Sequence, residues 1–246
     1  METVLLSDYA IVSDFCLNEL PHERTIVNTI NAYSWVMADE DPHFRRALMT
    51  GDLLLPDGIA IVWAVHFLFG IKIRKVAGAD LHKAVLDLLE AKGGKCFYLG
   101  ASDSTLNKIR ERLKLEYPHV LVETYSPPYK PVFSEEDNLK MIEAVNAFRP
   151  DVLFVGMTAP KQEKWVLDNA SSLQTRLIGS IGAVFDFYAG VKQRPPQWMI
   201  RLGLEWLGRL VSDPKHTWKR YVIYNPVYVW KIVQLKWRRE KLQHSL

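Results

Sequence analysis

The order of hydrophobic and polar positions predicts strands and helices that alternate along most of the chain. Short β-rich or apolar runs are followed by longer amphipathic segments, which is the pattern of βαβ units. Strands are expected at residues 25–30, 96–99, 120–124, 152–155 and 176–179, with a brief apolar run at 53–55. Helices are expected at residues 42–49, 59–69, 80–92, 104–116, 134–148 and 161–171. The pattern predicts an α/β fold whose Rossmann-like parallel sheet carries helices on both faces.

From Pro195 onward the pattern is helical and aromatic, so we divide the chain into a body, residues 1–193, and a C-terminal appendage, residues 194–246. The appendage has eleven Lys or Arg and three acidic residues, a net charge of +8, whereas the body has a net charge of −5. Five of the eight tryptophans lie in it: Trp198, Trp206, Trp218, Trp230 and Trp237. Such a segment suits an anionic membrane surface or nucleic acid. Its aromatic residues could equally pack on the body beneath a solvated charged face.

The membrane interpretation places one stretch, residues 226–242, in the headgroup region. Its apolar residues are interleaved with Lys and Arg, which makes it too polar to span a bilayer. The apolar residues expected to enter the headgroup region are Val229, Trp230, Ile232, Val233 and Trp237.

Overall composition is that of a soluble globular protein, with 48% hydrophobic and 24% charged residues in 246. This excludes a disordered chain and a small disulfide scaffold. Cys16 and Cys96 offer no metal spacing, which suits a reducing compartment. The longest apolar stretch has thirteen residues, 59–71, fewer than the roughly 20 that a bilayer requires. The first fourteen residues contain no Lys or Arg, unlike a secretory signal, so a cytoplasmic location is expected.

Candidate ligand-binding residues follow three of the predicted strands, where an open parallel sheet binds its ligands. These residues are Gly100 after the first, Gly156, Lys161 and Gln162 after the second, and Gly182 and Asp186 after the third. Each turn alone is compatible with ordinary loop and cap chemistry, because neither a G-x-G-x-x-G nor a Walker motif is present. Three glycine-bearing strand ends together favour a nucleotide ligand.

Two acidic motifs allow alternative interpretations. Asp57 lies between Pro56 and Gly58 directly before an apolar helix, so it is either an N-cap or a general base whose pKa is raised by desolvation. Residues 39–41, Asp-Glu-Asp, match the D-x-D pattern of metal-dependent sugar transferases. Because Asp41 precedes Pro42, a helix cap is the favoured interpretation there, and no metal is expected. The sequence contains no Ser-His-Asp order, G-x-S-x-G elbow or zinc spacing.

The chain resembles the WecG/TagA/CpsF glycosyltransferases of bacterial cell-surface polysaccharide synthesis. The similar stretches lie in order between about residues 25 and 221: 29–32, 41–48, 52–58, 76–80, 156–165, 182–187 and 201–206. The resemblance implies transfer of a sugar from a UDP-sugar to a polyprenyl-diphosphate-linked saccharide at the inner face of the cell membrane. Donors in such a family include UDP-N-acetylmannosamine, its uronic acid and UDP-glucose.

The resemblance also implies roles for individual residues. Asp57 corresponds to the catalytic base, Thr29 and Asn31 to polar residues of its pocket, and Gln162 to a substrate contact. The chemistry implied is inverting and independent of metal, so cations must offset the charge that develops on UDP. Arg209 and the nearby Arg220 are expected to supply them.

Two departures from the family pattern concern the cations. Lys75 stands where an arginine is usual, and His216 stands where another is expected. Lys cannot reproduce the bidentate contact of Arg. Lys75 is nevertheless expected to contact substrate.

The expected partners are a UDP-sugar donor, a lipid-linked acceptor and an anionic membrane surface, with no cofactor and no nucleic acid. The sequence leaves a homo-oligomer open. Two other functions compete with the glycosyltransferase: a non-catalytic nucleotide-sugar-binding protein docked on the membrane, and a nucleic-acid-binding module. The net negative body argues against the second.

Overall fold

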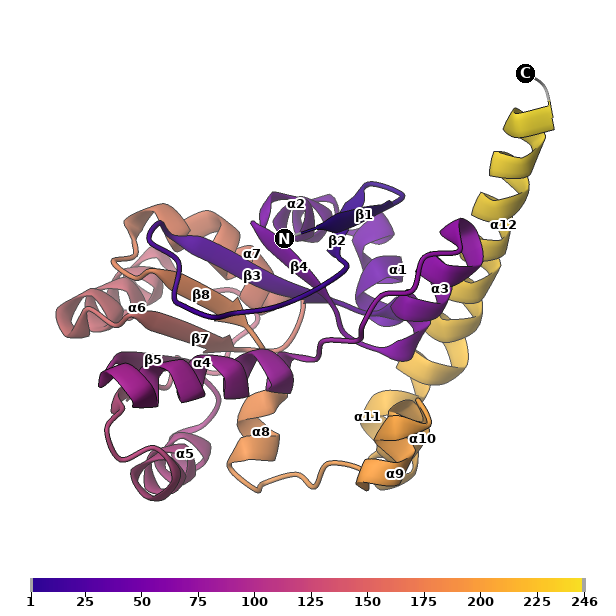
Figure 1. Cartoon of the computed structure of the whole chain (residues 1–246). Coiled ribbons are helices and arrows are strands. Elements are labelled where there is room, and N and C mark those ends of the chain that lie inside the picture. The colour runs from indigo at the N-terminus through magenta and orange to yellow at the C-terminus, as the bar shows by residue number, and fades with distance from the viewer. Residues whose placement is uncertain (1, 245–246) are drawn as a thin grey trace.

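The computed structural model describes residues 2–244, together with the side chains of all of these except residues 197, 201, 216 and 242–244. The side chain of His216, which departs from the family pattern, is therefore not among those described. An eight-stranded sheet has the order β1-β2-β4-β3-β8-β7-β5-β6 (Figure 1). Its strands are β1 Thr3–Leu6, β2 Tyr9–Val12, β3 Thr25–Ile30, β4 Leu53–Pro56, β5 Lys95–Gly100, β6 Leu121–Tyr125, β7 Val152–Gly156 and β8 Leu177–Ser180. All neighbouring strands pair in parallel except β1 with β2.

Helices connect the parallel strands and then form the C-terminal part of the chain. Those of the sheet region are α1 Ala32–Glu40, α2 Pro42–Thr50, α3 Ile59–Phe69, α4 Gly78–Lys92, α5 Asp103–Glu116, α6 Glu135–Phe148, α7 Lys161–Asn169 and α8 Val184–Tyr188. The C-terminal ones are α9 Gln197–Arg201, α10 Glu205–Ser212, α11 Pro214–Trp218, a π-helical segment Lys219–Tyr224 and α12 Asn225–His244. The α/β fold and the parallel sheet with helices on both faces are therefore confirmed.

Each strand of the central sheet divides its side chains between two cores. Cys96 and Tyr98 of β5 point toward the core beneath α4, α5 and α8. The intervening Phe97 and Leu99 point toward the core beneath α6 and α7. This alternation is the period of two that a strand imposes, and it leaves the central strands buried on both sides (Figure 1).

A third core joins the C-terminal helix α12 to α1 and α3. Tyr228 and Ile232 of α12 are both 0% exposed within it. The Tyr228 ring meets Trp35 edge-on with centroids 5.3 Å apart, and its hydroxyl donates to the Ala60 carbonyl at 3.3 Å. The prediction that Ile232 enters a membrane headgroup region is therefore wrong, because this side chain faces the body. The C-terminal helices are docked on the body rather than appended loosely.

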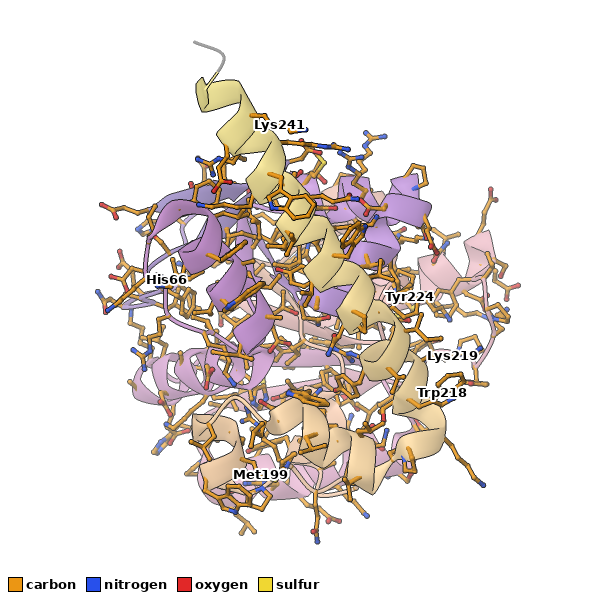
Figure 2. The ribbon with its side chains drawn as sticks, turned by 90° about the vertical axis from the view of Figure 1, so that its right-hand side faces the viewer. His66, Met199, Trp218, Lys219, Tyr224 and Lys241 are labelled. Carbon is orange, nitrogen blue, oxygen red and sulfur yellow. The ribbon has the colours of Figure 1, made fainter. Side chains whose placement is uncertain are left out.

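The other face of α12 remains exposed. Trp230 and Trp237 are 56% and 55% exposed, and Lys231 pairs with Asp39 at the edge of the body. In Figure 2 α12 runs across the front of the molecule beside α3. None of the helices in residues 2–244 has the length and apolar composition needed to cross a bilayer.

Candidate active site

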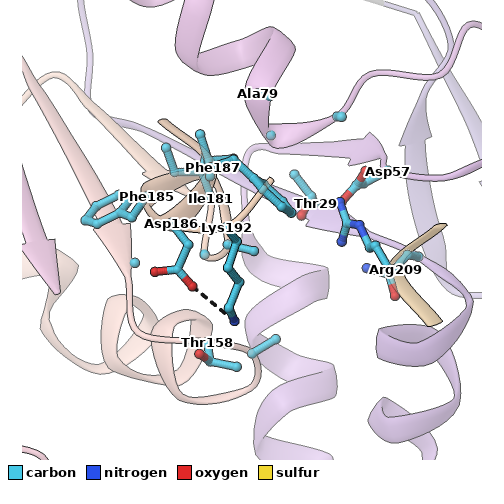
Figure 3. Close-up of a pocket in the computed structure, with 18 of the residues that line it drawn as sticks. Thr29, Asp57, Ala79, Thr158, Ile181, Phe185, Asp186, Phe187, Lys192 and Arg209 are labelled. Atoms are coloured by element: carbon cyan, nitrogen blue, oxygen red, sulfur yellow. Dashed lines mark ion pairs between the residues drawn. The ribbon is translucent and has the colours of Figure 1, made fainter. Parts of the chain in front are cut away.

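The carboxyl ends of β3, β4, β7 and β8 meet at one edge of the sheet, where the chain reverses its direction of winding. A cleft of about 650 Å³ opens there, between the strand ends and the helices α10 and α11 with the π-helical segment after them (Figure 3). This is the edge at which open α/β sheets bind ligands. Nine of the twelve predicted site residues line the cleft: Thr29, Asn31, Asp57, Gly156, Gln162, Gly182, Asp186, Arg209 and Arg220.

Asp57 is positioned by the pairing of β3 with β4. Ile30 lies opposite Pro56 in the parallel register, and the Asp57 backbone N–H extends the ladder by donating to the Ile30 carbonyl at 2.8 Å. The chain then turns at Gly58, whose φ of +121° favours glycine, and α3 begins. Gly58 is the N-cap of α3 and no side chain caps this helix, so the N-cap interpretation of Asp57 is wrong. The Asp57 carboxylate instead faces the cleft.

The surroundings of Asp57 suit a base. Enclosure in the protein raises the pKa of the Asp57 carboxyl above its ordinary value, and Glu205 acts in the same direction. Arg209, Arg220 and Lys75 act against this rise. Figure 3 shows the Arg209 side chain beside Asp57. A carboxylate with a raised pKa accepts a proton more readily near neutral pH than an ordinary surface carboxylate does.

Glu205 contacts three cationic side chains near Asp57. It accepts from Arg209 Nη2 at 2.7 Å, pairs with Lys75 Nζ at 3.2 Å and lies 3.5 Å from Arg194 Nε. Burial of Glu205 opposes its ionisation, but Arg209, Arg194 and Lys75 outweigh burial and lower its pKa to about 2. Glu205 therefore stays ionised, joins α10 to the segment before α4 and fixes Arg209 at the cleft. Glu205 lies in the stretch 201–206, which is similar to the family, but its sequence context predicts no role for it.

Gln162 is held by its own neighbour, Glu163. The Gln162 Nε2 donates to Glu163 Oε1 at 2.9 Å, and its Oε1 accepts from the Met157 backbone N–H at 3.3 Å. Glu163 is 2% exposed, its Oε2 has no hydrogen-bond partner among the residues that the structure describes, and burial raises its pKa to about 7. Glu163 is thus a second unusual carboxyl at the cleft. The sequence did not single it out, because charge at a helix start ordinarily indicates a solvated residue.

Gly100 and Lys161, both predicted to bind substrate, do not line the cleft. Gly100 packs behind it: a Cβ there would lie 2.5 Å from the Gly156 carbonyl oxygen, and its φ is +125°. The close approach of the Gly156 backbone explains why residue 100 is a glycine, so contact with a phosphate is not needed to explain it. Lys161 points away, because its Nζ lies 3.6 Å from the centroid of the Phe133 ring and donates to the Lys130 carbonyl. It holds the proline-rich loop instead.

The acidic triplet at residues 39–41 is engaged in structural contacts. Asp41 caps α2 by accepting from the Phe44 N–H at 3.0 Å and pairs with Lys164, as the helix-cap interpretation predicts. Asp39 pairs with Lys231 of α12. Across the described part of the chain, no three His, Cys, Asp or Glu side chains gather in a way that could hold a metal ion.

The open sheet with a charged cleft at the strand ends is typical of α/β proteins that bind a ligand at this edge. The model of the "Glycosyl transferase WecG/TagA/CpsF family" matches residues 9–242, nearly the whole chain. The chain belongs to this family, as the resemblance implied, and is a glycosyltransferase.

Three curated relatives share the name N-acetylglucosaminyldiphosphoundecaprenol N-acetyl-beta-D-mannosaminyltransferase. The chain is 28% identical to the one from Bacillus subtilis strain 168 over 79% of this chain and 74% of the relative. It is 29% identical to that of Bacillus spizizenii over 87% and 80%. It is 26% identical to that of Staphylococcus aureus strain MW2 over 97% and 91%.

Proposed function

We propose that the protein is an inverting, metal-independent glycosyltransferase that moves a sugar from a UDP-sugar to a polyprenyl-diphosphate-linked saccharide. UDP-N-acetylmannosamine is the favoured donor among the three considered, because the relatives are named for N-acetylmannosaminyl transfer. The observation that carries the proposal is the Asp57 carboxylate in the cleft, with a raised pKa and with Arg209 beside it.

In the proposed reaction, Asp57 accepts the proton of the acceptor hydroxyl as that oxygen attacks C1 of the donor sugar. The attack comes from the face opposite the diphosphate, so the C1–O bond to UDP breaks as the new C1–O bond forms and the configuration inverts. One base positioned at the attacking oxygen is sufficient for this displacement.

The leaving UDP gains negative charge as its bond to the sugar breaks. Arg209 and Arg220 line the cleft on the side of the C-terminal helices and can offset this charge. Arg220 is itself oriented by stacking over Tyr33 at 5.2 Å from the ring centroid. Fixed guanidinium groups at this place perform the task that a divalent metal performs in other sugar transferases.

A polyprenyl-linked acceptor resides in a bilayer, so the enzyme must reach a membrane surface. We propose peripheral binding at the inner face of the cell membrane through exposed aromatic and basic residues of α12 and its neighbours. Trp230 and Trp237 lie on its outer face, and Arg238 and Lys241 are exposed on the same helix. Cations near an anionic surface contribute about 1 kcal/mol each, enough together for reversible attachment.

Asp57→Asn tests the proposed base. The variant should bind UDP as tightly as the wild type, while kcat falls by roughly 10²–10⁴, the range for loss of general-base catalysis. Transfer is measured as UDP release and product mass with UDP-N-acetylmannosamine and a short-chain prenyl-diphosphate N-acetylglucosamine.

The matched control is Asp41→Asn, the same chemical change at a helix cap outside the cleft, where Asn caps about as well as Asp. It should leave kcat nearly unchanged. Near wild-type turnover by Asp57→Asn would remove Asp57 as the base, and absence of transfer by the wild type with every UDP-sugar would favour a non-catalytic binding protein.

A further inference from the structure

A second cavity, of about 240 Å³, opens beside Asp57. Its walls come from the beginning of α3, from Lys75 and from α9 and α10. Asn31, Asp57 and Arg209 line both this cavity and the large cleft. The proposed base therefore lies where the two spaces meet, which is the position that a group acting between two substrates must occupy.

Apart from the residues that line both, the two cavities have walls of different chemical character. The large cleft has Gly156, Gly182 and Gln162 at the strand ends. The second cavity has an apolar wall and a charged wall instead. The apolar wall consists of Ile59, Ala60, Ile200 and Trp206, and the charged wall of Lys75 and Glu205; Arg209 and Arg220 line both cavities.

Their sizes assign them to different ligands. Sites for small molecules and cofactors have volumes of roughly 300–1,000 Å³. The large cleft, at about 650 Å³, lies within that range and can hold a nucleotide-sugar. The second cavity, at about 240 Å³, lies below it and can hold a single sugar ring. A donor that fills the cleft leaves this smaller space for the acceptor sugar.

An exposed apolar ridge leads away from the second cavity along α3. Ile59, Trp63 and Phe67 are four residues apart and so lie on one face of the helix, 47%, 40% and 37% exposed. The Trp63 and Phe67 rings stack with centroids 5.0 Å apart, and Lys236 of α12 lies 5.7 Å from the Phe67 centroid. The helix carrying this ridge lies beside α12 (Figure 2). A hydrocarbon chain attached to a sugar in the cavity would find an apolar surface here.

We propose that the second cavity is the acceptor subsite and binds the sugar-diphosphate end of the lipid-linked acceptor. The acceptor hydroxyl lies toward Asp57, the diphosphate toward Lys75, and the first isoprene units along Ile59 and Trp63. Lys75 is then the cation for the acceptor diphosphate, whereas Arg209 and Arg220 line both spaces. This inference rests on the proposed function for the identity of the acceptor, but the partition of the two cavities is tested by binding alone.

The experiment places a bulky side chain in each cavity separately. Ile200 lines only the second cavity and Ala183 only the cleft, so Ile200→Trp and Ala183→Trp form a matched pair. Calorimetry measures binding of UDP and, separately, of a short-chain prenyl-diphosphate N-acetylglucosamine to each protein. Ile200→Trp should weaken acceptor binding by roughly ten- to a hundredfold, as overpacking of a filled site does, and leave UDP binding unchanged. Ala183→Trp should do the reverse.

Lys75→Ala supplies an independent measurement. It should weaken binding of the prenyl-diphosphate N-acetylglucosamine by about tenfold and leave an alkyl N-acetylglucosaminide, which has no diphosphate, unaffected. Retained UDP binding shows that Ile200→Trp and Lys75→Ala are folded, and retained acceptor binding shows the same for Ala183→Trp. Weaker UDP binding together with unchanged acceptor binding in Ile200→Trp would overturn the partition. If the partition holds but the wild type transfers no sugar, the proposed function fails and the acceptor subsite stands.

Discussion

Glu163 gives a prediction whose magnitude follows from its burial. The side chain is 2% exposed, and burial raises its pKa from 4.5 to about 7. At about 1.4 kcal/mol per unit of pKa, ionising this carboxyl in the folded protein costs about 3 kcal/mol more than in the unfolded chain. The bond from Gln162 Nε2 to Glu163 Oε1 favours the ionised form, but burial outweighs it, and Oε2 has no hydrogen-bond partner among the described residues.

The sign of the pH dependence follows from proton binding. Between pH 4.5 and about 7 the folded protein holds a proton on Glu163 that the unfolded chain has lost. The contribution of this group to stability is therefore complete below pH 4.5 and is lost as the pH rises through about 7. Glu163→Gln removes the ionisation but keeps an oxygen that can accept from Gln162 Nε2. Relative to the wild type, its free energy of unfolding should rise by about 3 kcal/mol from pH 4.5 to about 8.

Urea unfolding followed by tryptophan fluorescence measures this difference at several pH values. The same substitution at the exposed Glu143 of α6 is the control and should change stability by no more than about 0.5 kcal/mol at any pH. Parallel pH curves for wild type and Glu163→Gln would refute the reasoning. A third variant, Glu163→Leu, removes the acceptor for Gln162 and should lower transfer, which Glu163→Gln should preserve.

Two further predictions concern metal and membrane. Excess EDTA should leave the initial rate of transfer unchanged, because Asp39 and Asp41 are held by Lys231 and Lys164; a loss restored by Mn²⁺ or Mg²⁺ would make the triplet a metal site. Replacing Trp230 and Trp237 together by Ser should weaken sedimentation with anionic vesicles, whereas Tyr129→Ser, which removes an exposed aromatic residue from the proline-rich loop, should not. Equal vesicle binding by both variants would remove α12 as the membrane contact. Substitution is preferable to truncation at residue 226, which would also remove Tyr228 and Ile232 from the core.

The sequence by itself determined most of the central elements, because these are set by local signals. Asp41 followed by Pro42 begins α2, and the apolar run at 59–69 forms α3. The strands that end at Gly100, Gly156 and Ser180 alternate with helices as their pattern predicts. Since parallel strands share one direction, this order alone brought most of the predicted site residues to one edge of the sheet.

The β1–β2 hairpin and helix α1 were missed because their local signals are weak. The β1–β2 hairpin has strands of four residues, and only Ile11 of it pairs with the main sheet. Helix α1 buries Ser34, Trp35 and Val36 in succession. A helix covered on several sides has no period of 3.6 residues to detect, and here the helix start is given by the reciprocal bonds of Asn31 and Ser34.

Only the tertiary structure decided the directions and partners of the side chains at the site. It turned Lys161 toward the Phe133 ring and Ile232 into the core. It also brought Lys75 to Glu205, which is 130 positions further along the chain. Such contacts depend on how helices dock and on which charges must be paired once water is excluded, and neither condition is expressed in the local pattern of residues.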